Sequence, residues 1–148
     1  MTSYWSMRAK ALYSLFLFCF CLQFVFARSA SAYDLKTYVG KQSPLLFFAP
    51  SKSDPRFQKQ LEAIKSKSAE IKRAKIVLFY IFENELGRAD NLLLRVSDAQ
   101  ELRKNLKVSE GEFKILLLDL KGNQKASKAE ALDAEALTHF LNLPKLSK

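Results

Sequence analysis

Two hydroxyls and two cations lie within six residues, around a proline that can begin a helix. These residues are Ser51, Lys52, Ser53 and Arg56, and they flank Asp54 and Pro55. A helix start favours an anion, because its backbone amides are free and its dipole is positive there. The sequence therefore predicts a weak anion site. The alternative needs no ligand: the Asp54 carboxylate caps the helix itself, and the two cations are solvated.

The other residues that could do chemistry form no recognisable catalytic arrangement. His139 is the only histidine, and it is interpreted as a surface residue because a catalytic base needs a positioned partner. Glu83 and Glu85 follow an apolar run and are interpreted as a charged strand exit. Ser51 stands in no Gly-x-Ser-x-Gly motif, and the chain has no glycine-rich phosphate loop. We therefore expect no catalytic residue, no cofactor and no metal site.

The N-terminal segment has the pattern of a secretory signal and contains both cysteines. The pattern comprises basic Arg8 and Lys10, an apolar run over residues 11–27, and small residues at Ala30 and Ala32. Residues 1–32 are thus a predicted signal peptide, and cleavage after Ala32 would remove Cys19 and Cys21 from a periplasmic or secreted chain of residues 33–148. The alternative is an uncleaved membrane anchor, because the apolar run is only slightly shorter than the roughly 20 residues of a spanning helix.

The positive charge is moderate once the signal is removed. The formal net charge is +9, and three basic residues of the signal contribute to it, which leaves +6 for residues 33–148. The basic residues between 59 and 75 are interrupted by Glu62 and Glu70, as is typical of a solvated helix face. After export we expect no nucleic-acid partner and, once the signal is cleaved, no membrane. The expected partner is an extracytoplasmic protein or a small anion.

The first half of the mature chain predicts a βαβ unit. Residues 45–49 and 76–82 are apolar throughout, as expected for strands that are covered on both faces. Between them, Asp54 is expected to cap one helix that runs to Arg73, with apolar residues recurring along one face. The crossover would join the two strands in parallel. A polar loop over residues 84–91 is expected to follow.

The second half predicts a short helix, a hairpin and a final helix. Ser97 and Gln100 form a capping box for the short helix. Residues 113–120 and 124–128 would be the hairpin strands, the second at a sheet edge, and Asp133 would cap the final helix. This order resembles the thioredoxin layout. We therefore expect an α/β, thioredoxin-like fold whose four-stranded mixed sheet carries helices on both faces.

Two stretches are similar to the regions that hold the redox motifs of thioredoxins. The stretch Phe48–Arg56 stands where thioredoxins carry Cys-x-x-Cys, and Lys52 and Pro55 take the places of the two cysteines. In Gly111–Lys114, Phe113 takes the place of the cis-proline. Both hallmarks of thiol–disulfide chemistry are absent. The resemblance therefore implies a non-redox member of the fold.

Further motifs resemble one particular thioredoxin-like family. They are a Phe-Ala-Pro-Ser strand end, a Ser-Asp-Pro helix start, and Phe-Lys-Ile-Leu-Leu-Leu-Asp followed by Lys-Gly-Asn. Together they resemble the domain of unknown function 4174, over roughly residues 33–144. Members of that family include small exported bacterial proteins and a domain of animal extracellular sushi-repeat and equarin-type proteins. The resemblance implies fold and export, and the family has no established activity.

Three functions are compatible with the sequence. The first is an exported, redox-inactive binding module that contacts a protein or an anionic ligand near Ser51 to Arg56 and the loop 84–91. The second is a cysteine-independent enzyme or anion-binding protein that holds a carboxylate or phosphate at the same helix start. The third is a membrane-tethered structural protein, if the signal is retained as an anchor.

Overall fold

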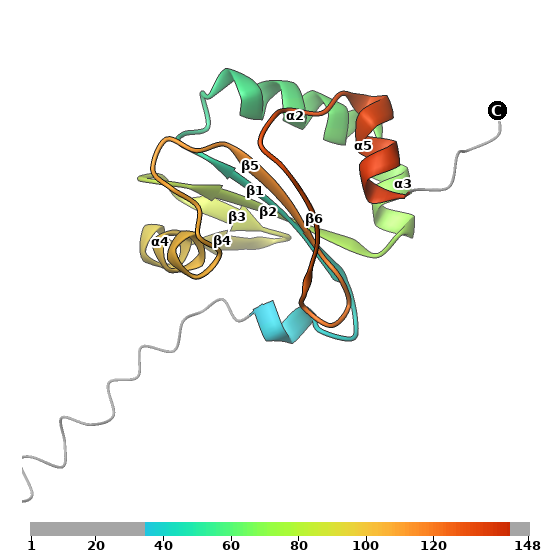
Figure 1. The fold of residues 1–148 in the computed structure, drawn as a ribbon, viewed down its shortest axis with the longest axis horizontal. Helices are drawn as coiled ribbons and strands as arrows, with labels where there is room; N and C mark the ends of the chain where they lie inside the picture. Colours follow the sequence, from blue (N-terminus) through green and yellow to red (C-terminus); the bar gives the residue numbers. More distant parts are fainter. Residues whose placement is uncertain (1–34, 143–148) are drawn as a thin grey trace, which may run out of the picture. The chain divides into compact units, whose positions relative to one another are not determined.

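A central pair of parallel strands is extended on both sides by antiparallel strands (Figure 1). The computed structural model describes residues 35–142, so the predicted signal, both cysteines and Pro144 lie outside the described residues. The elements are η2 (Leu35–Tyr38), β1 (Ser43–Ala49), α2 (Pro55–Ser66), α3 (Ser68–Arg73), β2 (Ile76–Phe82), β3 (Gly87–Ala89), β4 (Leu92–Leu94), α4 (Val96–Asn105), β5 (Lys114–Leu118), β6 (Gln124–Lys128) and α5 (Ala134–Leu141).

The sheet has six strands in the order β4-β3-β2-β1-β5-β6, not the four that the sequence predicts. The predicted βαβ unit is confirmed, because β1 and β2 pair in parallel over their whole length. The two additional strands are β3, within the predicted loop, and β4, immediately after it. Each has only three residues, which is too short for an alternating pattern to show in the sequence. They form because the outer edge of β2 offers unpaired backbone groups.

Helices cover both faces of the sheet, as predicted. In Figure 1, α2, α3 and α5 lie on one side of the sheet, whereas α4 and η2 lie on the other. Successive residues of β1 alternate between the two cores: Phe47 packs with the α2 and α5 side chains, and Phe48 with the α4 side chains. Among residues 35–142, no helix is long and apolar enough to span a bilayer.

The helix expected to end at Arg73 is two helices, divided at Lys67. The Lys67 amide donates to both Ala63 and Ile64 carbonyls, and the Ser66 hydroxyl also donates to the Ala63 carbonyl oxygen at 2.8 Å. These contacts tighten the last turn of α2 and end it. The apolar stripe nevertheless continues across the break, because Ile71 of α3 is buried.

Four other boundaries follow from local polar contacts. The caps predicted at Asp54 and Asp133 are confirmed. The capping box predicted at Ser97 and Gln100 is wrong, because α4 begins directly after Arg95. The Arg95 guanidinium instead donates to the Asp98 carboxylate at 3.0 and 3.1 Å. Strand β5 ends at Leu118 rather than at residue 120. There the Asp119 carboxylate accepts from two amides of the turn and directs the chain into β6.

The helical layer leaves part of the sheet uncovered. Whereas β1 is buried on both faces, Ile76, Leu78 and Tyr80 on the α2 side of β2 are only half-buried, so the prediction of a fully covered second strand is wrong. The reason is that α2 and α5 pack against β1 and β5, and no helix lies over β3 and β4 on that side (Figure 1). A groove along β2 results.

Candidate functional site

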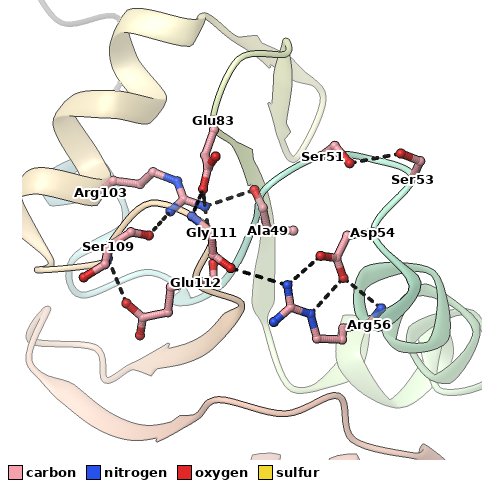
Figure 2. A network of polar contacts seen from close by, with 10 residues as sticks. All are labelled: Ala49, Ser51, Ser53, Asp54, Arg56, Glu83, Arg103, Ser109, Gly111 and Glu112. Carbon is pink, nitrogen blue, oxygen red and sulfur yellow. Dashed lines mark hydrogen bonds and ion pairs between the residues drawn. The ribbon is translucent and has the colours of Figure 1, made fainter.

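The predicted anion site comprises the loop before α2 and the first turn of that helix, and Asp54 is the centre of its polar contacts. Its carboxylate accepts from the Arg56 amide at 2.9 Å, and from Nε and Nη2 of the same arginine at 3.0 and 2.6 Å (Figure 2). The Arg56 guanidinium also lies 5.4 Å from the Phe113 ring centroid and donates to the Gly111 carbonyl at 3.4 Å. Asp54 therefore occupies the helix start, as in the capping alternative.

The other predicted site residues have different partners. The hydroxyls of Ser51 and Ser53 share a hydrogen bond of 3.0 Å. Lys52 instead lies 4.0 Å from the Glu85 carboxylate and 5.7 Å from the Phe82 ring centroid. The structure thus places Ser51, Lys52 and Ser53 in the loop before α2 and Arg56 in the first turn of α2, with the two cations held by different neighbours. Anion binding at this loop stays a prediction.

The cap at Asp54 makes a pH-dependent contribution to stability. The hydrogen bond and charge of Arg56 hold the pKa of Asp54 below its ordinary value. Because the pKa of Asp54 is lower in the folded state than in the unfolded state, its ionised carboxylate stabilises the fold at pH values above the unfolded-state pKa of about 3.9. This contribution is lost as the pH falls through the folded-state pKa.

We expect Asp54→Ala to lower the free energy of unfolding by about 1 kcal/mol near pH 7, and by much less near pH 2. Urea denaturation at the two pH values measures the difference. Asp133→Ala is the matched control, because that residue caps α5 away from any arginine contact of this kind. An equal loss for Asp54→Ala at both pH values would contradict the role of its charge.

A buried arginine, Arg103 of α4, forms a second polar cluster beside the first (Figure 2). Its side chain donates to the backbone oxygens of Ser109 at 2.8 Å and of Ala49 at 3.0 Å. Its Nη2 lies 3.4 Å from the Glu83 carboxylate, which in turn accepts from the Gly111 amide at 2.6 Å. The cluster therefore connects the ends of β1 and β2 with the loop before β5.

This cluster is structural, and the sequence analysis missed it. Burial lowers the pKa of Arg103, and the neighbouring carboxylates, Glu83 foremost, oppose that effect. Glu83 is not an exposed strand exit but a 14% exposed partner of this arginine. Arg103 Nε has no hydrogen-bond partner among the described residues, while Nη1 and Nη2 donate to backbone oxygens and Nη2 also pairs with the Glu83 carboxylate.

Other candidate chemistry is not supported in the described part of the chain. His139 is exposed on α5, as predicted. Within residues 35–142, no group of three or more histidine, cysteine, aspartate or glutamate side chains could hold a metal ion.

The described residues form a groove along β2, which we call the β2 groove. It consists of two open pockets of about 480 and 360 Å³ that share Tyr80 and Arg88. The first is lined by Gln42, Ser68, Ile71, Lys72, Ile76, Val77, Leu78, Asp90 and Asn91, and the second by Lys52, Phe57, Gln58, Leu61, Phe82, Leu86, Gly87 and Leu93. Strand register places Tyr80, Arg88 and Leu93 side by side across three strands, which form its floor and outer wall.

The outer wall of the β2 groove exposes large apolar side chains. Leu86, immediately before β3, and Leu93 of β4 are 49% and 71% exposed. Toward the inside of the groove, Tyr80 stacks on Phe47 with ring centroids 5.8 Å apart, and burial raises the pKa of its hydroxyl. The binding surface expected near Ser51 to Arg56 and the loop 84–91 includes parts of this groove, Lys52 and the segment with Arg88. The floor along β2 and the residues of α2 were not expected there, because the pairing of β2 with β3 and the position of α2 complete the groove.

Comparison with solved structures shows that the fold is thioredoxin-like. A reduced 2-Cys peroxiredoxin from Plasmodium vivax matches with a TM-score of 0.60 and 13% sequence identity, over 74% of this chain and 81% of that chain. The bacterioferritin comigratory protein of Xanthomonas campestris matches with a TM-score of 0.59 and 13% identity, over 74% and 83%. At this identity the likeness shows the fold alone.

Comparison with curated proteins found no match. The family resemblance inferred from the sequence motifs is confirmed by a family model. That model, described as Domain of unknown function (DUF4174), matches residues 34–141. The chain therefore belongs to the DUF4174 family.

Proposed function

We propose that this protein is a redox-inactive, thioredoxin-like binding module that acts after export, and that the β2 groove is its binding surface. The observation that carries the proposal is the exposure of Leu86 and Leu93 beside an apolar, concave floor. Exposed leucines that border a groove are typical of surfaces that bind a partner, since apolar area in contact with water is unfavourable.

The absence of thiols from the described domain supports the redox-inactive part of the proposal. Residues 35–142 contain no cysteine, and Lys52 and Pro55 stand at the loop where the resemblance to thioredoxins would place the redox pair. Lys52 forms the end of the β2 groove at that loop. In the proposed function, Lys52 therefore forms part of the wall of the binding surface.

An enzyme at the helix start has less support from the geometry. Ser51 and Ser53 hydrogen-bond to each other, and the Asp54 carboxylate is engaged by Arg56. In this loop no side chain is positioned to accept a proton from a serine, as nucleophilic catalysis would require.

A neutral, environment-sensitive dye such as Nile red tests the binding surface directly. We expect the purified protein to enhance and blue-shift the dye fluorescence, because the groove offers an apolar floor with half-buried aromatic side chains. The double variant Leu86→Ser/Leu93→Ser should reduce the enhancement several-fold. Both leucines are exposed, so the variant should unfold at nearly the same urea concentration as the wild type.

The matched control is Leu120→Ser. Leu120 is 49% exposed, the same as Leu86, but it lies at the turn between β5 and β6. This variant should bind the dye like the wild type. Equal losses in both variants would show that the dye reports exposed leucines in general, and the proposal would then be rejected.

A further inference from the structure

The β2 groove has about the dimensions of one α-helix. Resting on the proposed function, we infer that the occupant is an acidic, amphipathic helix of a partner protein. Three independent features lead to this: the width and length of the uncovered sheet, the position of the apolar side chains, and the sign of the charges around them.

The uncovered surface fits one helix beside α2. Strands β2 and β4 are separated by two interstrand spacings, about 10 Å, which is close to the diameter of a helix with its side chains. The half-buried part of β2, from Ile76 to Tyr80, extends over about 16 Å, the length of a helix of about 11 residues. On this face α2 and α5 already pack against each other, so a further helix next to α2 would continue the same layer.

The apolar side chains lie where a helix would bury them. Ile76, Leu78 and Tyr80 alternate along β2 and form a floor that is half-buried. Leu61 of α2 lines one wall, and Leu93 of β4 the other. A small ligand on the floor would leave the outer wall exposed, whereas a helix resting on three strands would cover the floor and both walls.

The charges around the groove are mostly positive. Lys72 lines the pocket that contains Ile76, Lys52 lines the pocket that contains Phe82, and Arg88 belongs to both. Asp90 is the one carboxylate among the residues that line the two pockets. The Arg88 Nε donates to the backbone oxygen of Asp90 at 2.8 Å, so this bond does not neutralise its charge.

Lys52 is neutralised only weakly. Its carboxylate partner Glu85 is 4.0 Å away, and both side chains are well exposed. Acidic residues beside the apolar stripe of a bound helix would meet cations at both ends and at the centre of the groove. A second copy of this chain fits less well, because residues 33–148 carry a formal net charge of +6.

Synthetic peptides of about 15 residues test the inference. The acidic peptide carries leucines at helical spacings with glutamates beside them; a second peptide has lysine in place of glutamate, and a third has two central prolines that prevent a helix. Fluorescence anisotropy at low salt should show that the acidic peptide binds about tenfold more tightly than either of the others. Arg88→Glu should reverse the preference between the glutamate and lysine peptides.

Lys125→Glu is the matched charge control, since Lys125 is exposed on β6 at the opposite sheet edge. It should bind the acidic peptide like the wild type. Equal binding of the lysine or proline peptide, or self-association that Arg88→Glu abolishes, would overturn the inference. If Nile red binding depends on Leu93 but no peptide binds, the inference of a helical occupant would be overturned and the proposed function would stand. Loss of both signals would overturn both.

Discussion

Replacing Arg103 with methionine is expected to lower the free energy of unfolding by about 3 kcal/mol, because it removes one partner of a buried ion pair. Arg103 is 6% exposed, and methionine keeps much of its packing volume but none of its donors. The Ala49 carbonyl oxygen and the Glu83 carboxylate would each lose a charged partner in a place that water reaches poorly. Urea denaturation measures the change.

Lys104→Met provides the control for this prediction. Lys104 is the next residue of α4 and is exposed, so its loss should change the free energy of unfolding by less than about 0.5 kcal/mol. Glu83→Gln adds a second comparison, because it removes the charge of the partner and keeps an acceptor for the Gly111 amide. If Arg103→Met were as stable as Lys104→Met, the cluster would contribute nothing to holding the strand ends together.

Replacing Gly87 with alanine is expected to separate β3 from β2 and to lower the free energy of unfolding by about 2 kcal/mol or more. A Cβ at this position would overlap the Tyr80 carbonyl oxygen and approach the Leu94 side chain to 3.2 Å. Because the oxygen belongs to the backbone of a strand, it cannot rotate away. Strands β3 and β4 must move, and with them the outer wall of the β2 groove.

Two measurements distinguish this displacement of β3 from the general destabilisation that follows when a glycine is replaced. Amide hydrogen exchange should accelerate in β3 and β4 more than in β1, and Nile red binding should fall along with it. Gly111→Ala is the control: a Cβ there meets nothing within 4 Å, but its positive φ makes alanine unfavourable by about 1 kcal/mol. Unchanged hairpin exchange in Gly87→Ala would show that the strand pairing accommodates the methyl group.

The features that the sequence predicted correctly are those that depend on neighbouring residues. The apolar runs of β1 and β2 and the caps at Asp54 and Asp133 are local signals, and each is found at the expected place. In contrast, β3 and β4 form because β2 has a free edge, which no pattern within three residues can reveal.

The candidate site shows the same division. The loop with Lys52 could be singled out from its residue types, whereas the role of Arg103 depends on the Ala49 carbonyl, which lies far from it in the chain. An arginine in a short helix is ordinarily read as solvated, and only tertiary packing makes it the donor that connects two strand ends. The β2 groove could not be predicted from the sequence, because it depends on which strands the helices leave uncovered.

The two edges of the sheet have different chemistry, and this has a consequence for aggregation. At one edge, β6 has the sequence Gln-Lys-Ala-Ser-Lys and is exposed over most of its length. Lysines on an edge strand oppose the addition of another chain, because like charges would be brought together. At the other edge, β4 has leucines but only three residues, which offers little backbone for a continuous ladder. The lysines of β6 at one edge and the short length of β4 at the other thus limit fibril-like growth of the sheet, even though large apolar side chains remain in contact with water.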